Sequence, residues 1–416
     1  MAGIYCRIVC GIIAGTLSCS CAALFNLSIY AGTAIHAAGI GENYPGCEAD
    51  DTGLFMKLKK HLLAIFAVAA GLTGYYLYGG YPPEIKLTEQ ENSVVNTFLD
   101  EMTTRCVGRY LIDMPESFSV TNDNIKAFIN EAPVKTVRIY RTAFEQKIRL
   151  REETLRQEKT VNPQDMPYLK QIYPLPAGME GVVFERNRSI SMPDSARTLE
   201  ALVYTNGVAV EIEMKARNGL SSRYDDDRKD IPEIYGNTVP EKLAELIQLL
   251  KRITGKKDTE IPQQAGFCLP EVFIADGLGE NKEELHITYT SNKYPRADFD
   301  FSTDNFNKAD DTMLDRSAEM DEIITAAEGR TIQKGKRKIN GLYTEEWMVF
   351  GNINNDEKGL RFVFHSNENV TQPESPWMYI SFLQRGLSGN HQLTENEAVS
   401  TWENITGTLR LRPGAF

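Results

Sequence analysis

Residues 199–214 read LEALVYTNGVAVEIEM, and the fold class follows from them. Two apolar runs flank the pair Asn206-Gly207. A tight type I′ turn needs a positive φ at both of its central residues, and Asn-Gly tolerates this best. Within 208–214 apolar side chains at every second position alternate with small or acidic ones, as in a strand with one buried and one wet face. The stretch therefore predicts an antiparallel hairpin in a sheet that is covered on one side.

The elements around this hairpin occur twice along the chain. A Thr88/Glu91 capping box predicts a first helix, with an apolar stripe at 94–102. The first half then predicts strands and helices at 105–112, 134–140, 144–157, 182–185, 199–205, 208–214 and, from a Thr238/Glu241 capping box, 238–253. The second half predicts them at 266–269, 285–290, 297–301, 312–327, 346–350, 360–364, 377–382 and, from a Thr394/Glu397 capping box, 394–409. Each half thus contains a strand, a helix, three strands and a closing helix, with a cysteine near its start.

This repeated order predicts an α+β protein of two tandem similar domains, with mainly antiparallel sheets and flanking helices. We place the N-terminal domain at 82–255 and the C-terminal domain at 265–416. The polar run GKKDTEIP (255–262) marks the linker between them, which we place at 256–264. Glycine at 255 is expected to end the first closing helix.

Residues 56–81 (MKLKKHLLAIFAVAAGLTGYYLYGGY) predict the location of the chain. A basic start, an apolar run and an aromatic end are typical of a membrane-targeting segment with its basic side in the cytoplasm. We expect an uncleaved inner-membrane anchor, with a cleaved signal and a buried core helix as alternatives. Everything after it would face the bacterial periplasm. Residues 1–55 are expected to be a mis-assigned start or an extra apolar segment, because Met56 and the lysines after it resemble a natural N-terminus.

Cysteine usage agrees with an oxidising compartment. Five of the seven cysteines precede Met56, which leaves Cys106 and Cys268 in the exported part. Two cysteines in such a compartment are expected to form a disulfide. Two separate buried thiols are the alternative, because a free cysteine behaves as a small hydrophobe.

The charge of the chain excludes a nucleic-acid partner. The formal net charge is −12, and residues 1–81 hold equal numbers of acidic and basic residues, so the exported part carries all of it. A nucleic acid demands a positive face on its partner. An acidic surface suits solubility and a basic protein partner.

No arrangement in the sequence points to catalysis or metal binding. The exported part has three histidines, His286, His365 and His391. None stands in an HExxH or HxH motif, so a zinc site has no local signature. The stretch GLSGN at 386–390 has Asn390 where a lipase-type nucleophile elbow has its second glycine. We therefore expect a binding protein that is not an enzyme and needs no metal or other cofactor.

The candidate partner contacts lie in two polar loops that precede the closing helices, at 221–230 and 386–394. The first contains three adjacent aspartates, which lack the spacing of a calcium loop. A solvated acidic loop is the ordinary outcome, and an electrostatic contact with a partner is the sharper hypothesis. A basic run, KGKRK at 334–338, is expected in solvent before a strand. The residues singled out for partner binding are Arg223, Tyr224, Asp225, Asp226, Asp227, Ser388, Asn390 and His391.

Four segments resemble a family of immunity proteins that protect bacteria against phospholipase effectors of type VI secretion. They are TRCVGRYLIDMP (104–115), TAFEQKIRLREE (142–153), GVVFERNR (181–188) and AGFCL (265–269). The resemblance spans about 85–416 and implies a claw-like, two-domain α+β protein in the periplasm. It also implies a cognate lipase as the partner, clasped so that its lid or active-site entrance is blocked.

Two functions therefore compete. An immunity protein would bind and occlude a lipase through a broad polar surface. An envelope-anchored module that binds lipid or cell-wall ligands would instead require a deep apolar pocket.

Overall fold

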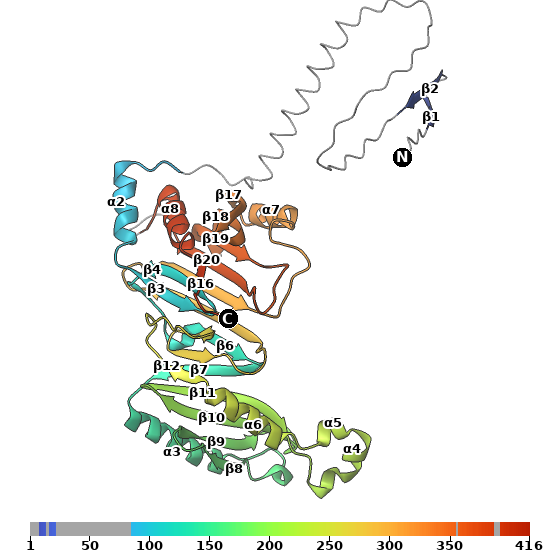
Figure 1. Ribbon diagram of the computed structural model, residues 1–416, viewed down its shortest axis with the longest axis vertical. Helices are drawn as coiled ribbons and strands as arrows, with labels where there is room; N and C mark the ends of the chain where they lie inside the picture. Colours follow the sequence, from blue (N-terminus) through green and yellow to red (C-terminus); the bar gives the residue numbers. More distant parts are fainter. Residues whose placement is uncertain (1–7, 14–15, 22–84, 355–356, 387–391) are drawn as a thin grey trace, which may run out of the picture. The chain divides into compact units, whose positions relative to one another are not determined.

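The computed structural model describes residues 8–13, 16–21, 85–354, 357–386 and 392–416 (Figure 1). The chain divides into two compact units, 1–67 and 68–416. In the first unit, β1 (Ile8–Ile13) and β2 (Thr16–Cys21) form an antiparallel pair. The predicted anchor at 56–81 lies outside the described residues. Among the helices that are described, none is long and apolar enough to cross a membrane.

Two halves with the same order of elements make up the second unit. The first half contains α2 (Glu89–Phe98), β3 (Met102–Val107), β4 (Tyr110–Pro115), β5 (Phe118–Ser119), β6 (Ile125–Ile129), β7 (Ala132–Arg138), α3 (Arg141–Gln157), β8 (Leu169–Pro174), β9 (Glu180–Asn187), β10 (Ala196–Thr205), β11 (Val208–Arg217), α4 (Asp225–Asp230), α5 (Pro232–Tyr235), α6 (Val239–Leu250) and β12 (Ile253–Gly255). The second half contains β13 (Gly266–Cys268), β14 (Val272–Ala275), β15 (Glu283–Ser291), β16 (Ala297–Asp304), α7 (Ser317–Ala326), β17 (Arg330–Ile339), β18 (Leu342–Asn354), β19 (Glu357–Ser366), β20 (Trp377–Arg385), α8 (Glu395–Thr406) and β21 (Arg410–Leu411). The α+β class with two tandem domains is confirmed, while the domain boundaries and the claw-like arrangement stay predictions.

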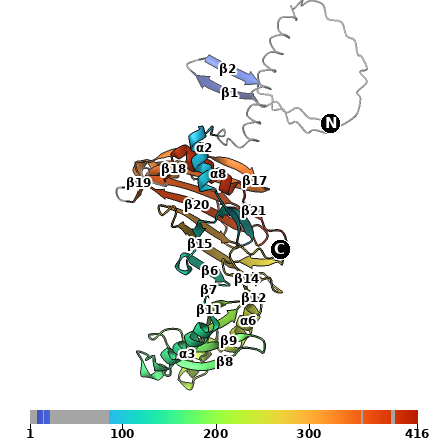
Figure 2. The ribbon, with the colours of Figure 1, turned by 90° about the vertical axis from the view of Figure 1, so that its left-hand side faces the viewer.

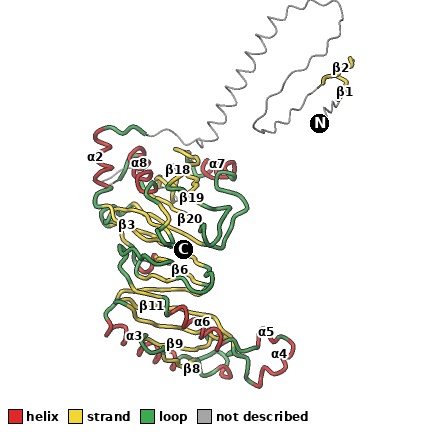
Figure 3. Tube along the Cα trace, viewed as in Figure 1, coloured by secondary structure: helices red, strands yellow, loops and turns green. Residues whose placement is uncertain are grey.

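One antiparallel sheet runs through both halves, in the order β17-β18-β19-β20-β16-β15-β6-β7-β11-β10-β9-β8. In Figure 3 the labelled strands β18, β19, β20, β6, β11, β9 and β8 follow this order from top to bottom. The halves meet where β15 pairs with β6, with Leu285 opposite Ala127. Counted outward from this pair, both halves place corresponding strands in corresponding positions. The duplication seen in the sequence is therefore a symmetric one in space.

Helices cover both faces of the sheet at its ends. Phe144 and Leu155 of α3 pack on Phe184 and Leu202, and Leu246 of α6 packs on the opposite face. In the second half α7 covers the face that α3 covers, and α8 covers the face that α6 covers. Strand alternation explains the arrangement, because successive side chains point to opposite faces. Helix α2 lies beside α8 (Figures 1 and 2), and Asn396 donates to Glu91 across the contact.

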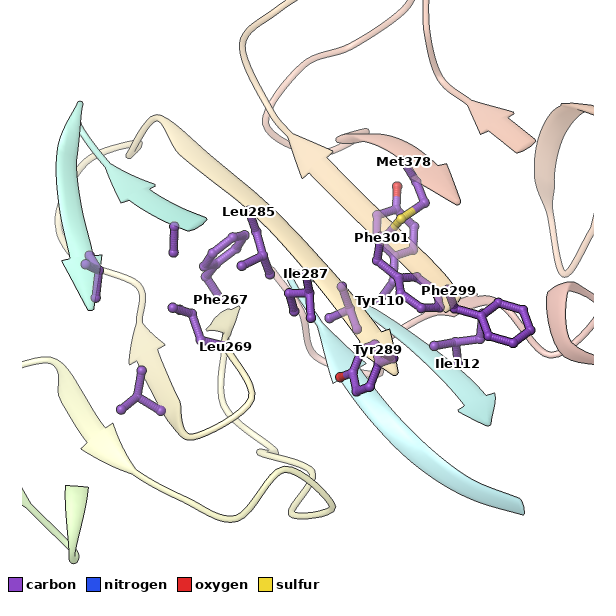
Figure 4. Close-up of a cluster of buried hydrophobic side chains, with 14 of the residues drawn as sticks. Tyr110, Ile112, Phe267, Leu269, Leu285, Ile287, Tyr289, Phe299, Phe301 and Met378 are labelled. Atoms are coloured by element: carbon purple, nitrogen blue, oxygen red, sulfur yellow. The ribbon is translucent and has the colours of Figure 1, made fainter. Parts of the chain in front are cut away.

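Two small sheets exchange strands between the halves. Strands β3 and β4 from the start of the first half pair with β21 from the end of the second. Conversely, β13 and β14 from the start of the second half pair with β12 from the end of the first. Both small sheets pack on the middle of the large sheet, where Phe267 lies against Leu285, and Tyr110 near Phe301 (Figure 4). Each half is therefore completed by a strand of the other.

A disulfide joins the two small sheets. Cys106 and Cys268 are bonded, their Cα atoms lie 5.7 Å apart, and both residues are fully buried. Gly108 and Cys268 also exchange backbone hydrogen bonds of 2.9 and 2.8 Å. Because Cys106 and Cys268 occupy the same position in β3 and β13, the bond links corresponding points of the two halves.

Arg109, in the turn between β3 and β4, adds a buried ionic link. Its Nη2 lies 2.6 Å from Glu283 Oε1 at the start of β15 and 2.7 Å from Asp276 Oδ1. The side chains of Arg109 and Glu283 are only 7% and 3% exposed. Burial raises the pKa of Glu283, although Arg109 opposes this, and burial alone would lower the pKa of Arg109, which its carboxylate partners raise.

Several local predictions need correction. The run 105–112 is not one strand, because Gly108 has a φ of +60° and turns the chain between β3 and β4. Gly255 does not end a helix but lies in β12. The basic run 334–338 does not precede a strand but belongs to β17. The helix expected at 312–327 begins only at Ser317.

Two of the three predicted capping boxes are confirmed, and the third is wrong. Those at Thr88/Glu91 and Thr394/Glu397 are formed as predicted. Thr238 makes none, because its hydroxyl accepts from the Arg217 amide instead, and the side chain of Asn237 accepts from the first helical amide.

Replacing Gly207 with alanine is expected to lower the free energy of unfolding by about 1 kcal/mol, because an alanine must adopt a left-handed conformation there. Asn206 and Gly207 have φ of +47° and +82° in the turn between β10 and β11, as the sequence predicts. Gly279→Ala, at a glycine with open space around its Cα and no positive φ, is the matched control. Urea denaturation measures both, and equal midpoints would contradict the prediction.

Candidate partner-binding surface

Two residues singled out for partner binding, Arg223 and Tyr224, also make contacts within the fold. Arg223 and Tyr224 lie in a short 3-10 turn followed by α4, where the sequence suggested a solvated loop. Arg223 pairs with Asp165 and Asp194, and the buried Tyr224 donates its hydroxyl to Asp194 over 2.8 Å. The helix forms because three aspartates in its first turn suit the positive end of the helix dipole. Arg223 makes these contacts through Nη2 and remains exposed, so its contact with a partner stays a prediction.

The three aspartates of α4 remain exposed. Asp225 pairs with Arg228, and Asp226 lies 2.9 Å from Lys229 Nζ. Exposed pairs of this kind contribute well under about 1 kcal/mol and leave the carboxylates accessible. Contact of Asp225, Asp226 and Asp227 with a partner stays a prediction.

The other three residues, Ser388, Asn390 and His391, lie outside the described residues. Their segment follows β20, whereas α4 follows β11. Four strands separate β20 from β11 in the sheet, and because each neighbouring pair is antiparallel, β11 and β20 point in opposite directions. The chain therefore leaves β11 and β20 at opposite ends of the strands. Contact of Ser388, Asn390 and His391 with a partner stays a prediction.

A different surface joins the two halves. It is the side of the central strands β6, β15, β16 and β20 that faces away from the small sheets, between α3 and α7. The strand register sets its side chains directly opposite one another in rows. We call it the open face and define it by Lys126, Glu284, His286, Thr288, Asp300, Ser302, Tyr379 and Ser381. All of them except the buried Ser381 are exposed or half-buried.

Hydrogen bonds between strands hold the open face in place. Thr288 donates to Asp300 Oδ1 over 2.6 Å, and Ser381 donates to Asp300 Oδ2 over 2.9 Å. His286 Nδ1 lies 2.8 Å from Ser302 Oγ. These bonds fix the side chains before any partner arrives, which lowers the ordering cost of binding.

Three aromatic rings border the open face along β19 and β20. Trp377 stacks on Tyr379 with ring centroids 6.0 Å apart, and His365 meets Tyr379 edge-on at 5.1 Å. Burial lowers the pKa of His365 and raises the pKa of Tyr379, so both rings are neutral near pH 7. Tryptophan and tyrosine at a polar rim are typical anchors of protein interfaces.

The open face lacks the groups that its one serine–histidine pair would need for catalysis. A catalytic histidine is oriented by a third group on its other ring nitrogen. Among the described residues, none hydrogen-bonds the second ring nitrogen of His286. The described residues also hold no group of three or more His, Cys, Asp or Glu that could bind a metal ion. The arrangement suits recognition of another molecule by contact.

A cleft of about 340 Å³ lies on the other side of the junction, beside Arg109. Four charged side chains, those of Arg109, Asp276, Glu280 and Glu374, lie among its lining residues, beside Leu278 and Phe416. The deep apolar pocket of a lipid-binding module would have a different lining.

The sequence contained the signal for the open face. In β15 and β16 polar residues at every second position predict a wet strand face. The sequence does not show which strands are neighbours in the sheet, so it could not place Asp300 beside Tyr379. The pairing of β15 with β6 joins segments more than 150 residues apart, and only the structure reveals it.

Comparisons with known proteins point to one family. A family model for the N-terminal domain of Tle cognate immunity protein 4 matches residues 103–256, and a model for its C-terminal domain matches 260–414. No curated protein matches the chain.

Two solved structures share the fold. The apo immunity protein TplEi of the type VI secretion system of Pseudomonas aeruginosa is 18% identical, with a TM-score of 0.59, and the match covers 76% of this chain and 99% of that one. A chain from the Tle4–Tli4 complex is 17% identical, with the same TM-score and the same coverage. Because the two family models match in tandem over most of its length, the chain belongs to the Tle cognate immunity protein 4 family.

Proposed function

We propose that this protein is an immunity protein that binds a cognate lipase effector of type VI secretion and blocks the entrance to its active site. The tandem match to both domains of one immunity family carries the proposal. A related chain was solved as a Tle4–Tli4 complex, which supports an effector protein as the partner. The producing cell would thereby be protected from its own lipase and from that of its siblings.

The proposed site of action is the periplasm, with the protein held at the inner membrane by residues 56–81. The basic start and apolar run of that segment support the anchor. The Cys106–Cys268 disulfide supports an oxidising compartment.

Occlusion requires shape and contact and no chemical step in the inhibitor. The exchanged strands, the disulfide and Arg109 hold the two halves together, so little ordering remains to be done on binding. A preorganised, polar and aromatic surface such as the open face meets this need.

Titrating the purified protein into its cognate lipase is expected to abolish ester hydrolysis at a 1:1 ratio. A type VI lipase effector from the same organism is the enzyme to use, and a secreted lipase from an unrelated organism is the control. Hydrolysis of a chromogenic ester and calorimetric titration measure inhibition and stoichiometry together. Full lipase activity in the presence of excess protein would refute the proposed function.

A further inference from the structure

Asp300, at the centre of the open face, carries a charge that no cation in the described part of the chain neutralises by an ion pair. Both of its oxygens accept from neutral hydroxyls, those of Thr288 and Ser381. Two residues earlier on the same face of β16, Asp298 pairs with Arg385. A carboxylate has about four acceptor sites, so Asp300 keeps capacity for a charged donor.

An aromatic ring lies beside this carboxylate. Tyr379 is opposite Ser302, one step diagonal from Asp300, and diagonal neighbours in a sheet are about 7 Å apart. Burial raises the pKa of Tyr379, a hydrogen bond with Ser381 opposes this, and the negative charge of Asp300 adds to the increase. Trp377 stacks on Tyr379 with an interplanar angle of 23°.

A carboxylate beside an aromatic ring favours arginine over lysine. The planar guanidinium can donate two N–H groups to a carboxylate and lay its flat face on a ring at the same time. The compact ammonium of lysine offers no flat face to the ring. The net charge of −12 adds a general attraction for basic partners.

We propose that the open face binds an arginine side chain of the lipase effector, with Asp300 accepting from its guanidinium and Tyr379 stacking on its plane. This inference rests on the proposed function and names the chemistry of the contact. Lys126 and Arg361 lie at the margins of the surface and would direct the arginine toward its centre.

Asp300→Asn is expected to weaken binding of the lipase about 10- to 100-fold, because a hydrogen bond to a charged group is lost while side-chain size is kept. Asp298→Asn is the matched control, on the same strand and face, and should bind within about twofold of the wild type because its carboxylate is already paired. Calorimetry at 50 and 300 mM salt measures both, and the salt dependence should shrink only in Asp300→Asn.

A second variant guards against a fold defect. Thr288→Lys places a cation directly opposite Asp300 on β15, where it competes with the incoming arginine, and should weaken binding to a similar degree. Thermal unfolding checks that each variant is folded. If the wild type binds and Asp300→Asn and Thr288→Lys bind equally well, the arginine site is refuted and the proposed function stands. If the wild type does not bind, the proposed function itself fails.

Discussion

Replacing Arg109 with methionine is expected to lower the free energy of unfolding by about 3–5 kcal/mol, as when one partner of a buried ion pair is removed. Glu283 would then stay buried without the positive charge of Arg109, which balances its negative charge in the wild type. Urea denaturation at pH 7.5 measures the loss. The double variant Arg109→Met/Glu283→Gln is the control. It also removes the unpaired negative charge of Glu283, so it should regain much of the stability.

The same variant should show a characteristic pH dependence. Burial raises the pKa of Glu283 in the folded protein, and without Arg109 it rises further above that of the unfolded chain. A carboxyl group with a raised folded pKa binds its proton more tightly in the folded state, so stability is regained as the pH falls through that pKa and is lost above it. Arg109→Met should therefore gain stability relative to the wild type between pH 7.5 and pH 5. A loss below about 1 kcal/mol at pH 7.5, or no relative gain on acidification, would contradict the ionic role of Arg109.

Removing the disulfide is expected to cost about 4–5 kcal/mol, because the bond closes a loop of 162 residues and restricts the unfolded chain. Cys106→Ala/Cys268→Ala tests this in urea denaturation. Wild-type protein unfolded in the presence of a reductant is the matched control and should show the same midpoint as the double variant. Native protein should resist mild reduction, because both cysteines are fully buried. A double variant as stable as the oxidised wild type would show that the strand exchange alone holds the halves together.

Local features of the fold could be predicted from the sequence, because short-range chemistry fixes them. The Asn206-Gly207 turn sets its own register, and Thr88 and Thr394 cap helices with partners three residues away. A second Asn-Gly pair, Asn340-Gly341, makes the same turn between β17 and β18 and was available as a signal. It would have extended the basic run at 334–338 into the strand to which it belongs.

Long-range features could not be predicted, because they depend on partners distant in the sequence. Nothing near Thr238 shows that Arg217 will occupy its hydroxyl. The open face could not be predicted for the same reason. The acidic run at 225–227 stands out in the sequence, yet Asp300 matters only when β15, β16 and β20 lie side by side.

The exchange of strands between the small sheets limits how this family can be recombined. A chimera that takes its first half from one relative and its second half from another would have to seat β21 of one parent on β4 of the other, and β12 on β14. Both strand pairs, β21 with β4 and β12 with β14, would then join strands from different parents. Specificity for a new toxin should therefore evolve by point changes on the exposed strands more readily than by shuffling whole domains.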